Sequence, residues 1–151
     1  MIEGVVIKNL VTHHDERGFF KEIFRFPNEF REMSIGQMSH SLVREGVVKA
    51  WHGHEKQGQW NYVVTGKIKV ALYDNRKKSS TYKNLIEFYI GEGEDSKGYF
   101  FPKGVLHGYK CLIGPMNIIY VTSGVYDLAD EIRIEPTDPE IGYDWSLKPR
   151  Y

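Results

Sequence analysis

The sequence predicts an all-β protein built as a single domain. Its 151 residues are enough for one domain with a sizeable core. Short apolar or alternating runs follow one another closely, separated by Gly, Asp, Asn and Ser, as in a β-sandwich or β-barrel. Hardly any stretch shows the 3.6-residue period of an amphipathic helix. These observations favour a β fold over a mixed one.

The clearest predicted strand is Lys67–Asp74, whose apolar side chains alternate with more polar ones, as in a strand with one face in water. Only Pro27–Ser34 resembles a short helix, with Asn28 placed to cap it. The Pro-rich tail, Glu135–Tyr151, is expected to wrap across the surface or onto a partner subunit. The other predicted strands are Glu3–Asn9, Gly18–Arg25, Trp60–Gly66, Leu85–Gly91, Gly98–Pro102 and Met116–Thr122.

Charge and cysteine content narrow the function classes. The 20 Lys and Arg residues balance 20 Asp and Glu residues, so no broad basic face for nucleic acid is expected. Cys111 stands alone, which excludes an internal disulfide and fits a reducing compartment. The start of the chain is too short and acidic for a signal peptide, and no apolar run approaches the roughly 20 residues of a membrane helix. We therefore expect a cytoplasmic protein that binds neither nucleic acid nor membrane.

Between Gly46 and Gly66 the chain carries two histidines at a regular spacing. Five residues separate Gly46 from His52, one separates His52 from His54, four precede Gln59, and six more precede Gly66. Residues i and i+2 of a strand point to the same face, so both histidines would project into the interior of a barrel. Gln59 would come from the adjoining strand, and Gly66 would make a hairpin turn.

This spacing resembles the first cupin motif, G-x5-H-x-H-x4-E-x6-G, with Gln59 in the place of the usual glutamate. Downstream, PKGVLHG resembles the core of the second motif, P-x-G-x-x-H, in which Pro102 and Gly104 would form a bend that presents His107. Two motifs in order indicate a cupin double-stranded β-helix, or jelly roll. We expect one domain over residues 1–151, a cupin core at about 35–125, extended N-terminal strands and a short C-terminal tail.

From about Asp15 to Trp145 the chain resembles the dTDP-4-dehydrorhamnose 3,5-epimerase family, cupins that act on nucleotide-linked 4-keto-6-deoxy sugars. DERGFFKE is similar to D-x-R-G-x-F-x-E, QMSHS to Q-x-N-x-S, DNRKKSSTY to D-x-R-x-x-S-P-T-F, and PKGVLHGY to P-x-G-F-A-H-G-F. YVTSGVYDLADE then resembles Y-x5-Y-x4-E, and DPEIGYDW resembles D-P-x-L-x-I-x-W. Each motif is loose alone, and their shared order carries the resemblance.

The resemblance implies roles for individual residues. His52 matches the base that removes the carbon-bound proton beside the 4-keto group, and Tyr120 matches the acid that reprotonates the opposite face. Such a proton is acidic because its loss gives an enolate, and a neutral imidazole can accept it. Arg17 and Glu22 match positions that reach a neighbouring subunit's nucleotide, so a homodimer is expected. The implied substrate-binding residues are Arg17, Glu22, Gln37, Lys49, Gln59, His107, Tyr126 and Glu131.

Several positions depart from the family pattern. Lys49 replaces an arginine and lacks its bidentate fork. Gln59 replaces the lysine that helps to stabilise the enolate. The aspartate that orients the base lies in a C-terminal L-S-x-K-D segment of the family, which has no counterpart before Tyr151, so Asp138 or Asp144 would have to substitute. Double epimerisation, 3-epimerisation, ketoisomerisation and another sugar nucleotide all stay open.

The pair of His52 and His54 permits a second interpretation. Members of the family carry H-x-Q here, whereas a metallocupin uses H-x-H. With Gln59 and His107, the pair would form a three-histidine, one-amide shell for one divalent transition metal such as Fe, Mn, Ni, Cu or Zn. Neutral glutamine compensates the metal's charge less well than glutamate does, so we expect an enzyme without metal or other cofactor. A non-catalytic cupin that binds sugar nucleotides is a third alternative.

Overall fold

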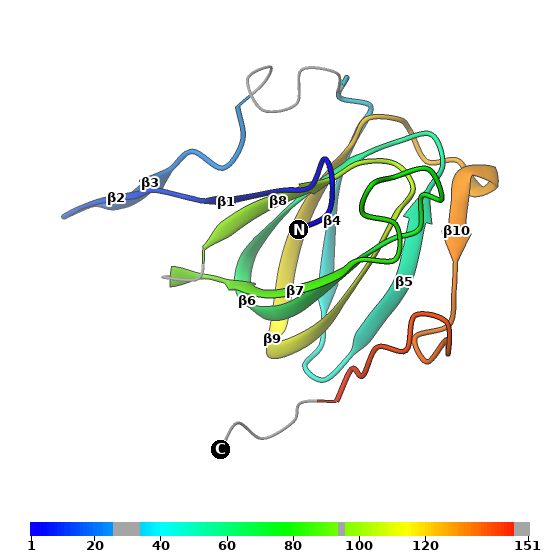
Figure 1. Cartoon of the computed structure of the whole chain (residues 1–151). Helices are drawn as coiled ribbons and strands as arrows, with labels where there is room; N and C mark the ends of the chain where they lie inside the picture. The colour runs from blue at the N-terminus through cyan, green and yellow to red at the C-terminus, as the bar shows by residue number, and fades with distance from the viewer. Residues whose placement is uncertain (26–33, 94–95, 147–151) are drawn as a thin grey trace.

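The protein folds into an antiparallel β-barrel (Figure 1). An N-terminal hairpin and a C-terminal tail lie at its periphery. The structure is a computed structural model, and it describes residues 1–25, 34–93 and 96–146. The helix predicted at Pro27–Ser34 lies outside the described residues except for Ser34. No helix in the described part of the chain is long and apolar enough to cross a membrane.

Ten strands and one short 3-10 helix are found in the described residues. An eight-stranded sheet runs in the order β1-β8-β6-β9-β5-β10, with β4 also pairing with β9 and β7 with β6, while β2 and β3 form a separate hairpin. The elements are β1 (Val6–Asn9), β2 (Thr12–Asp15), β3 (Gly18–Lys21), β4 (Gln37–Val43), β5 (Val48–His54), β6 (Gln59–Asp74), β7 (Leu85–Gly91), β8 (Lys97–Phe101), β9 (Val105–Thr122), η2 (Leu128–Asp130) and β10 (Glu131–Arg133).

The two longest strands, β6 and β9, are neighbours at the centre of the main sheet and pair with each other along their length. The two predicted strands Trp60–Gly66 and Lys67–Asp74 are parts of the single strand β6. The hairpin turn predicted at Gly66 is therefore wrong. Gly66 has φ +85° inside β6, where the register against β9 shifts, and a Cβ atom there would lie 2.5 Å from the Ile113 carbonyl oxygen. Glycine thus allows the strand to bend without ending.

Other predicted strands correspond to observed ones with shorter or longer bounds. Glu3–Asn9 contains β1, Gly18–Arg25 contains β3, Leu85–Gly91 is β7, Gly98–Pro102 overlaps β8, and Met116–Thr122 is the end of β9. Three strands, β2, β4 and β10, were not among the predicted runs. Their sequences, THHD, QMSHSLV and EIR, are polar or short and carry little apolar alternation.

The main core fills the space between the two walls of the barrel. Side chains of β6 alternate between this core and the other face of the strand, but the face of Lys67–Asp74 that was expected in water is largely buried, with Ala71 and Tyr73 in a second cluster. The core residues are Ile2, Val5, Val43, Val63, Ile68, Val70, Leu72, Ile90, Tyr99, Phe101, Val105, Cys111, Met116 and Ile118. This arrangement has the cupin jelly-roll form that the two histidine motifs indicated.

The C-terminal tail packs against the outer surface of β5. Trp51 is fully buried there, with its ring centroid 5.1 Å from that of Trp145 and 5.7 Å from that of Tyr143. The Lys110 ammonium group donates a hydrogen bond to the Trp145 carbonyl oxygen at 3.1 Å. The expectation that the tail wraps across the surface is confirmed for its described part.

The N-terminal hairpin of β2 and β3 projects away from the barrel (Figure 1). Phe19 and Phe20, in its second strand, are 65% and 68% exposed. Exposing large aromatic side chains to water is unfavourable, and burial against a partner surface would remove that free-energy cost.

Candidate active site

A cavity of about 250 Å³ opens inside the barrel. Polar side chains dominate its wall, and they come from strands β4, β5, β6, β9 and β10 and from the two loops that follow β5 and β9. The lining residues are Gln37, Ser41, Lys49, His52, His54, Gln57, Gln59, Asn61, His107, Tyr109, Ile118, Tyr120, Thr122, Tyr126 and Glu131.

Most of the residues expected in a site meet in this cavity. The ones that line it are Gln37, Lys49, His52, His54, Gln59, His107, Tyr120, Tyr126 and Glu131. Arg17 and Glu22 do not line it. Arg17 lies by the turn of the N-terminal hairpin and pairs with Asp15, whereas Glu22 follows β3 and pairs with Arg25. Within one chain, these two residues are therefore placed outside the site.

Strand β5 presents its histidines to the cavity and its tryptophan to the tail. His52 and His54 line the cavity, whereas Trp51 between Ala50 and His52 is buried on the other face with the tail. This is the period-two alternation predicted from the spacing of the histidines. The same register places His52 directly opposite His107 on β9.

His52 lies against a carboxylate that is held on both oxygens. The Nδ1 atom of His52 is 3.2 Å from Oε1 of Glu131, while Nη2 of Arg133 donates to Oε2 at 2.8 Å. The hydrogen bond from Arg133, and then that from His52, hold the pKa of Glu131 below its ordinary value. An ionised carboxylate only accepts hydrogen bonds, so Nδ1 of His52 must donate. In the neutral form of the ring, Nε2 then carries the lone pair that a general base requires.

His54 lies against both an amide and a carboxylate. Its Nδ1 atom is 3.2 Å from Nε2 of Gln57 and 3.4 Å from Oδ2 of Asp130. Gln57 accepts the Gly124 N–H with its oxygen, so its nitrogen faces the ring. Burial lowers the pKa of His54, although the nearby Asp130 opposes this effect. Nδ1 of His54 therefore faces both an amide donor and a carboxylate acceptor, and the tautomer of the ring decides which of them it binds.

His107 is the most enclosed of the three cavity histidines. Its ring stacks on Phe101 with a centroid separation of 4.4 Å, and its Nδ1 atom is buried with no hydrogen-bond partner among the described residues. Desolvation, assisted by the proximity of His52 and His54, lowers the pKa of His107 well below its ordinary value. His107 is therefore a neutral ring in the cavity wall.

Tyr120 reaches the cavity from the part of β9 that pairs with β4, whereas His52 is opposite the other end of β9. Its hydroxyl lies 3.4 Å from the Ser41 hydroxyl. Tyr109, from the same strand, also lines the cavity, and burial raises the pKa of its hydroxyl. The cavity thus contains imidazole and phenol groups that enter from different parts of the wall.

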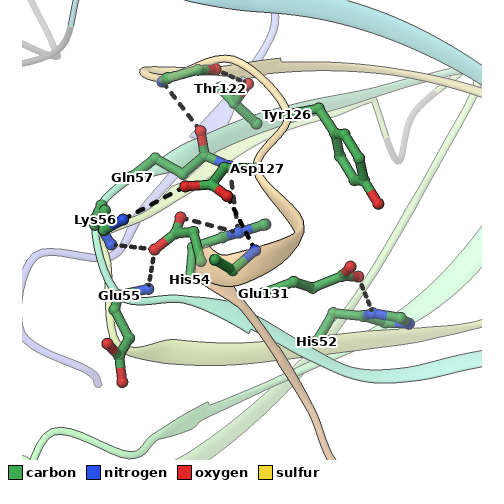
Figure 2. A network of polar contacts seen from close by, with 12 residues as sticks. His52, His54, Glu55, Lys56, Gln57, Thr122, Tyr126, Asp127 and Glu131 are labelled. Atoms are coloured by element: carbon green, nitrogen blue, oxygen red, sulfur yellow. Dashed lines mark hydrogen bonds and ion pairs between the residues drawn. The ribbon is translucent and has the colours of Figure 1, made fainter.

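Two loops beside the cavity hold each other in place (Figure 2). Oδ1 of Asp130 accepts the backbone N–H groups of Glu55 and Lys56 at 3.0 and 2.8 Å. Gln57 accepts the Gly124 N–H at 3.1 Å, and the Lys56 ammonium group is 3.4 Å from Asp127. This network fixes the loop that follows β5 and hence the position of His54.

The carboxylate beside His52 is Glu131 rather than Asp138 or Asp144. Asp138 accepts backbone N–H groups of Glu140 and Ile141, and Asp144 accepts that of Ser146, so both are used within turns of the tail. Sequence reasoning placed Glu131 in the site without this pairing, because the pairing depends on the contact between β10 and β5.

The four residues of the alternative metal shell, His52, His54, Gln59 and His107, all line the cavity. Among the described residues, no three His, Cys, Asp or Glu side chains are arranged so that they could hold a metal ion. The amide nitrogen of Gln59 donates to Oδ1 of Asn61 at 2.8 Å, and Nδ1 of His54 is engaged by Gln57. Two of the four shell residues, Gln59 and His54, are thus hydrogen-bonded to other cavity residues.

Sequence reasoning missed several residues of the cavity. Ser41, Gln57, Asn61, Tyr109, Ile118 and Thr122 line it, and Asp130 supports it. The alternation that places Gln59 in the wall also places Asn61 there, two residues further along the strand. The two-residue alternation of side chains along the strand was therefore sufficient to predict Asn61 in the cavity wall.

A family model described as dTDP-4-dehydrorhamnose 3,5-epimerase matches residues 1–150. The chain belongs to this family. Within it, the chain is 42% identical over 151 residues to the spore coat polysaccharide biosynthesis protein SpsL of Bacillus subtilis, covering 98% of this chain and 99% of that protein. It is 34% identical to a probable low-salt glycan biosynthesis epimerase of Haloferax volcanii, covering 97% of this chain and 96% of that protein.

Solved structures of the epimerase family share the fold. A dTDP-6-deoxy-D-glucose-3,5-epimerase from Legionella pneumophila, in complex with dTDP-4-keto-L-rhamnose, matches with a TM-score of 0.88 and 26% identity, covering 97% of this chain and 81% of that chain. A 4-keto-6-deoxy sugar epimerase from Streptomyces spheroides matches with a TM-score of 0.86 and 27% identity, covering 97% and 76%. The predicted family and cupin jelly-roll fold are confirmed.

Proposed function

We infer that the protein is an epimerase that acts on a nucleotide-diphospho-4-keto-6-deoxy sugar. The observation that carries this inference is the state of His52. Its Nδ1–H is bound to Glu131, which leaves Nε2 as a proton acceptor in a cavity that also contains Tyr120. Membership of an epimerase family and similarity to enzymes of 4-keto-6-deoxy sugars support this substrate class.

The reaction needs one proton removed and one returned. His52 takes the proton from the carbon beside the ketone, and the electron pair of the C–H bond moves into an enolate. Glu131 stabilises the imidazolium that forms, because its carboxylate is already bound to Nδ1. Tyr120 then gives its hydroxyl proton to the same carbon from the other face, which inverts the centre.

Exchange with deuterated water tests this function directly. The protein is incubated with dTDP-4-keto-6-deoxyglucose, and deuterium at C3 and C5 is followed separately by NMR. Exchange at C3 is expected, and additional exchange at C5 would identify a double epimerase. If no position exchanges with this sugar linked to any of several nucleotide bases, while the protein still binds it, the protein is a binding cupin and the proposal fails.

We propose that catalysis requires no metal, because Gln59 and His54 of the possible metal shell are already hydrogen-bonded to Asn61 and Gln57. Metal analysis of protein purified without chelator tests this proposal. Less than about a tenth of a metal ion per chain, with full exchange activity after EDTA treatment, is expected. One metal per chain that is lost in His54→Ala, together with activity, would contradict it.

We also propose that the enzyme is a homodimer and works in the cytoplasm. Lys49 is the only Lys or Arg that lines the cavity in the described part of the chain, although a nucleotide diphosphate carries several negative charges. Arg17, with a side chain 81% exposed on the projecting hairpin, could supply a second cation to a neighbouring copy. The buried Cys111 thiol suits a reducing compartment. Light scattering at several concentrations should give the dimer mass, and Arg17→Ala should weaken dTDP binding.

A further inference from the structure

Strand β6 places two amide side chains side by side in the cavity wall. Gln59 and Asn61 are two residues apart, so they point to the same face, and they are only 6% and 2% exposed. The Gln59 Nε2 group donates a hydrogen bond to Oδ1 of Asn61 at 2.8 Å. This bond orients the Asn61 amide, because it fixes which end of the amide is the oxygen.

The other end of the Asn61 amide is an unused donor. Its Nδ2 atom is buried and has no hydrogen-bond partner among the described residues. An unpaired buried donor opposes folding, and native proteins keep few of them. The group therefore calls for an acceptor that is absent from the chain itself, such as an oxygen atom of a ligand in the cavity.

Asn61 also lies beside the residue that carries the acid role. In the pairing of β6 with β9, Asn61 is directly opposite Tyr120, and both side chains line the cavity. A ligand whose reacting carbon is within reach of the Tyr120 hydroxyl would thus bring its adjacent carbonyl oxygen close to this part of the wall.

We propose that the Asn61 side-chain N–H donates a hydrogen bond to the keto oxygen of the sugar and stabilises the enolate, with Gln59 as its positioning residue. This inference rests on the proposed function and adds a catalytic residue to it. Preorganised donors aimed at a developing oxyanion are among the strongest contributions to catalysis. In this arrangement a neutral amide pair does the work for which the family uses a lysine at the position of Gln59.

The electron and proton movements balance. His52 takes the proton as the C–H bond breaks, and a carbon–carbon double bond forms while the carbonyl π pair moves onto oxygen. The Asn61 N–H group faces that oxygen and transfers no proton. When Tyr120 protonates the carbon, the negative charge leaves the oxygen and the ketone is restored.

The test is a substitution of a single atom. Asn61→Asp keeps an oxygen to accept from Gln59 but replaces the N–H donor with an acceptor. We expect deuterium exchange into dTDP-4-keto-6-deoxyglucose to fall by about 10²- to 10³-fold, as when one oxyanion donor is removed elsewhere. The KM should change less than threefold, because the donor acts mainly on the enolate. Gln59→Leu, which removes the positioning bond, should cause a smaller loss.

Asn117→Asp is the matched control. Asn117 lies on β9 outside the cavity, donates to Thr65 at 2.9 Å, and contacts His40 at 2.9 Å. The same chemical change there should leave exchange within twofold of the wild type. Circular dichroism and thermal unfolding identify folded variants, and Asn61→Ala replaces Asn61→Asp if the latter does not fold.

The role of Asn61 and the proposed epimerase function can fail independently in this experiment. A wild-type protein that exchanges deuterium while Asn61→Asp or the folded Asn61→Ala exchanges within threefold of it overturns the role of Asn61 and leaves the proposed function intact. A wild-type protein without any exchange overturns the proposed function itself. A loss confined to Asn61 and Gln59 variants, with Asn117→Asp unaffected, supports the assignment.

Discussion

His52 and His54 leave β5 on the same face, and each lies beside one of two consecutive acidic residues, yet the groups around the two rings differ. His52 donates through Nδ1 to Glu131 and keeps its lone pair on Nε2. His54 faces both the Gln57 amide nitrogen and the Asp130 carboxylate with Nδ1, and it is more buried than His52. The two side chains are 34% and 16% exposed.

The difference lies in what else each carboxylate binds. Glu131 is held by the Arg133 guanidinium, so the carboxylate stays ionised and its second oxygen is available to His52. Asp130 is 3% exposed and accepts two backbone N–H groups, so it chiefly ties a loop in place. Two similar His–carboxylate pairs can therefore have different roles, one in proton transfer and the other in loop structure.

The largest expected effect is on the exchange reaction when His52 is replaced. His52→Asn should lower the rate of deuterium exchange by about 10³- to 10⁴-fold, because the general base is lost, with little change in the melting temperature. His54→Asn should lose less than tenfold in rate and should instead lower the melting temperature. Equal losses of rate in both variants would contradict the different roles assigned to the two histidines.

Next in size is the loss of charge on Glu131. Glu131→Gln should reduce kcat by roughly 10²-fold with KM nearly unchanged, because the tautomer of His52 is no longer enforced and its imidazolium is no longer stabilised. Glu55→Gln, the same change at an exposed neighbouring carboxylate, is the control. A Glu131→Gln enzyme with wild-type kcat would show that Glu131 only contributes to structure.

A change at Asp130 should affect stability more than chemistry. Asp130→Ala leaves the Glu55 and Lys56 N–H groups without their acceptor. We expect the free energy of unfolding to fall by about 2 kcal/mol in a urea titration. Asp127→Ala, which removes an exposed ion pair with Lys56 and a hydrogen bond from the Ala129 N–H, should cost less in the same titration. An equal cost in both variants would contradict the distinction between the buried and exposed contacts.

The smallest effect concerns the pH dependence of stability. The folded protein keeps His107 neutral because burial lowers its pKa, so the unfolded chain binds the extra proton as the pH falls below about 6.5. Stability is therefore fully present above that pH and declines below it, by about 1 kcal/mol between pH 6.5 and 5.5 for this group. His107→Asn should flatten this part of the curve in denaturant titrations. His54 contributes less, because Asp130 opposes the decrease in its pKa.

The sequence predicted the parts of the site that follow from local periodicity. The spacing of His52 and His54 correctly placed both rings on the cavity face, and the Gly104 bend, with φ +79°, indeed leads into the strand that carries His107. The family and fold followed from motifs in order along the chain. These features depend on residues close in sequence or on the order of motifs.

What the sequence left open depends on contacts between distant segments. Glu131 is 79 residues from His52, and their contact exists only because β10 pairs with β5. No local pattern separates Glu131 from Asp138 or Asp144 as the partner of the base. Gly66 was misplaced for a related reason, since a glycine with positive φ serves equally well in a turn and in a bend of one strand.

The packing of the tail against β5 has an optical consequence. Trp51 is one residue from His52, and its indole ring lies beside that of Trp145, whereas Trp60 lies in a separate cluster with its ring centroid 5.3 Å from that of Phe24. In a Trp60→Phe variant, tryptophan emission would come only from Trp51, in β5, and Trp145, which packs against it. Any displacement of β5 on ligand binding would then alter the emission of that pair, without an added label.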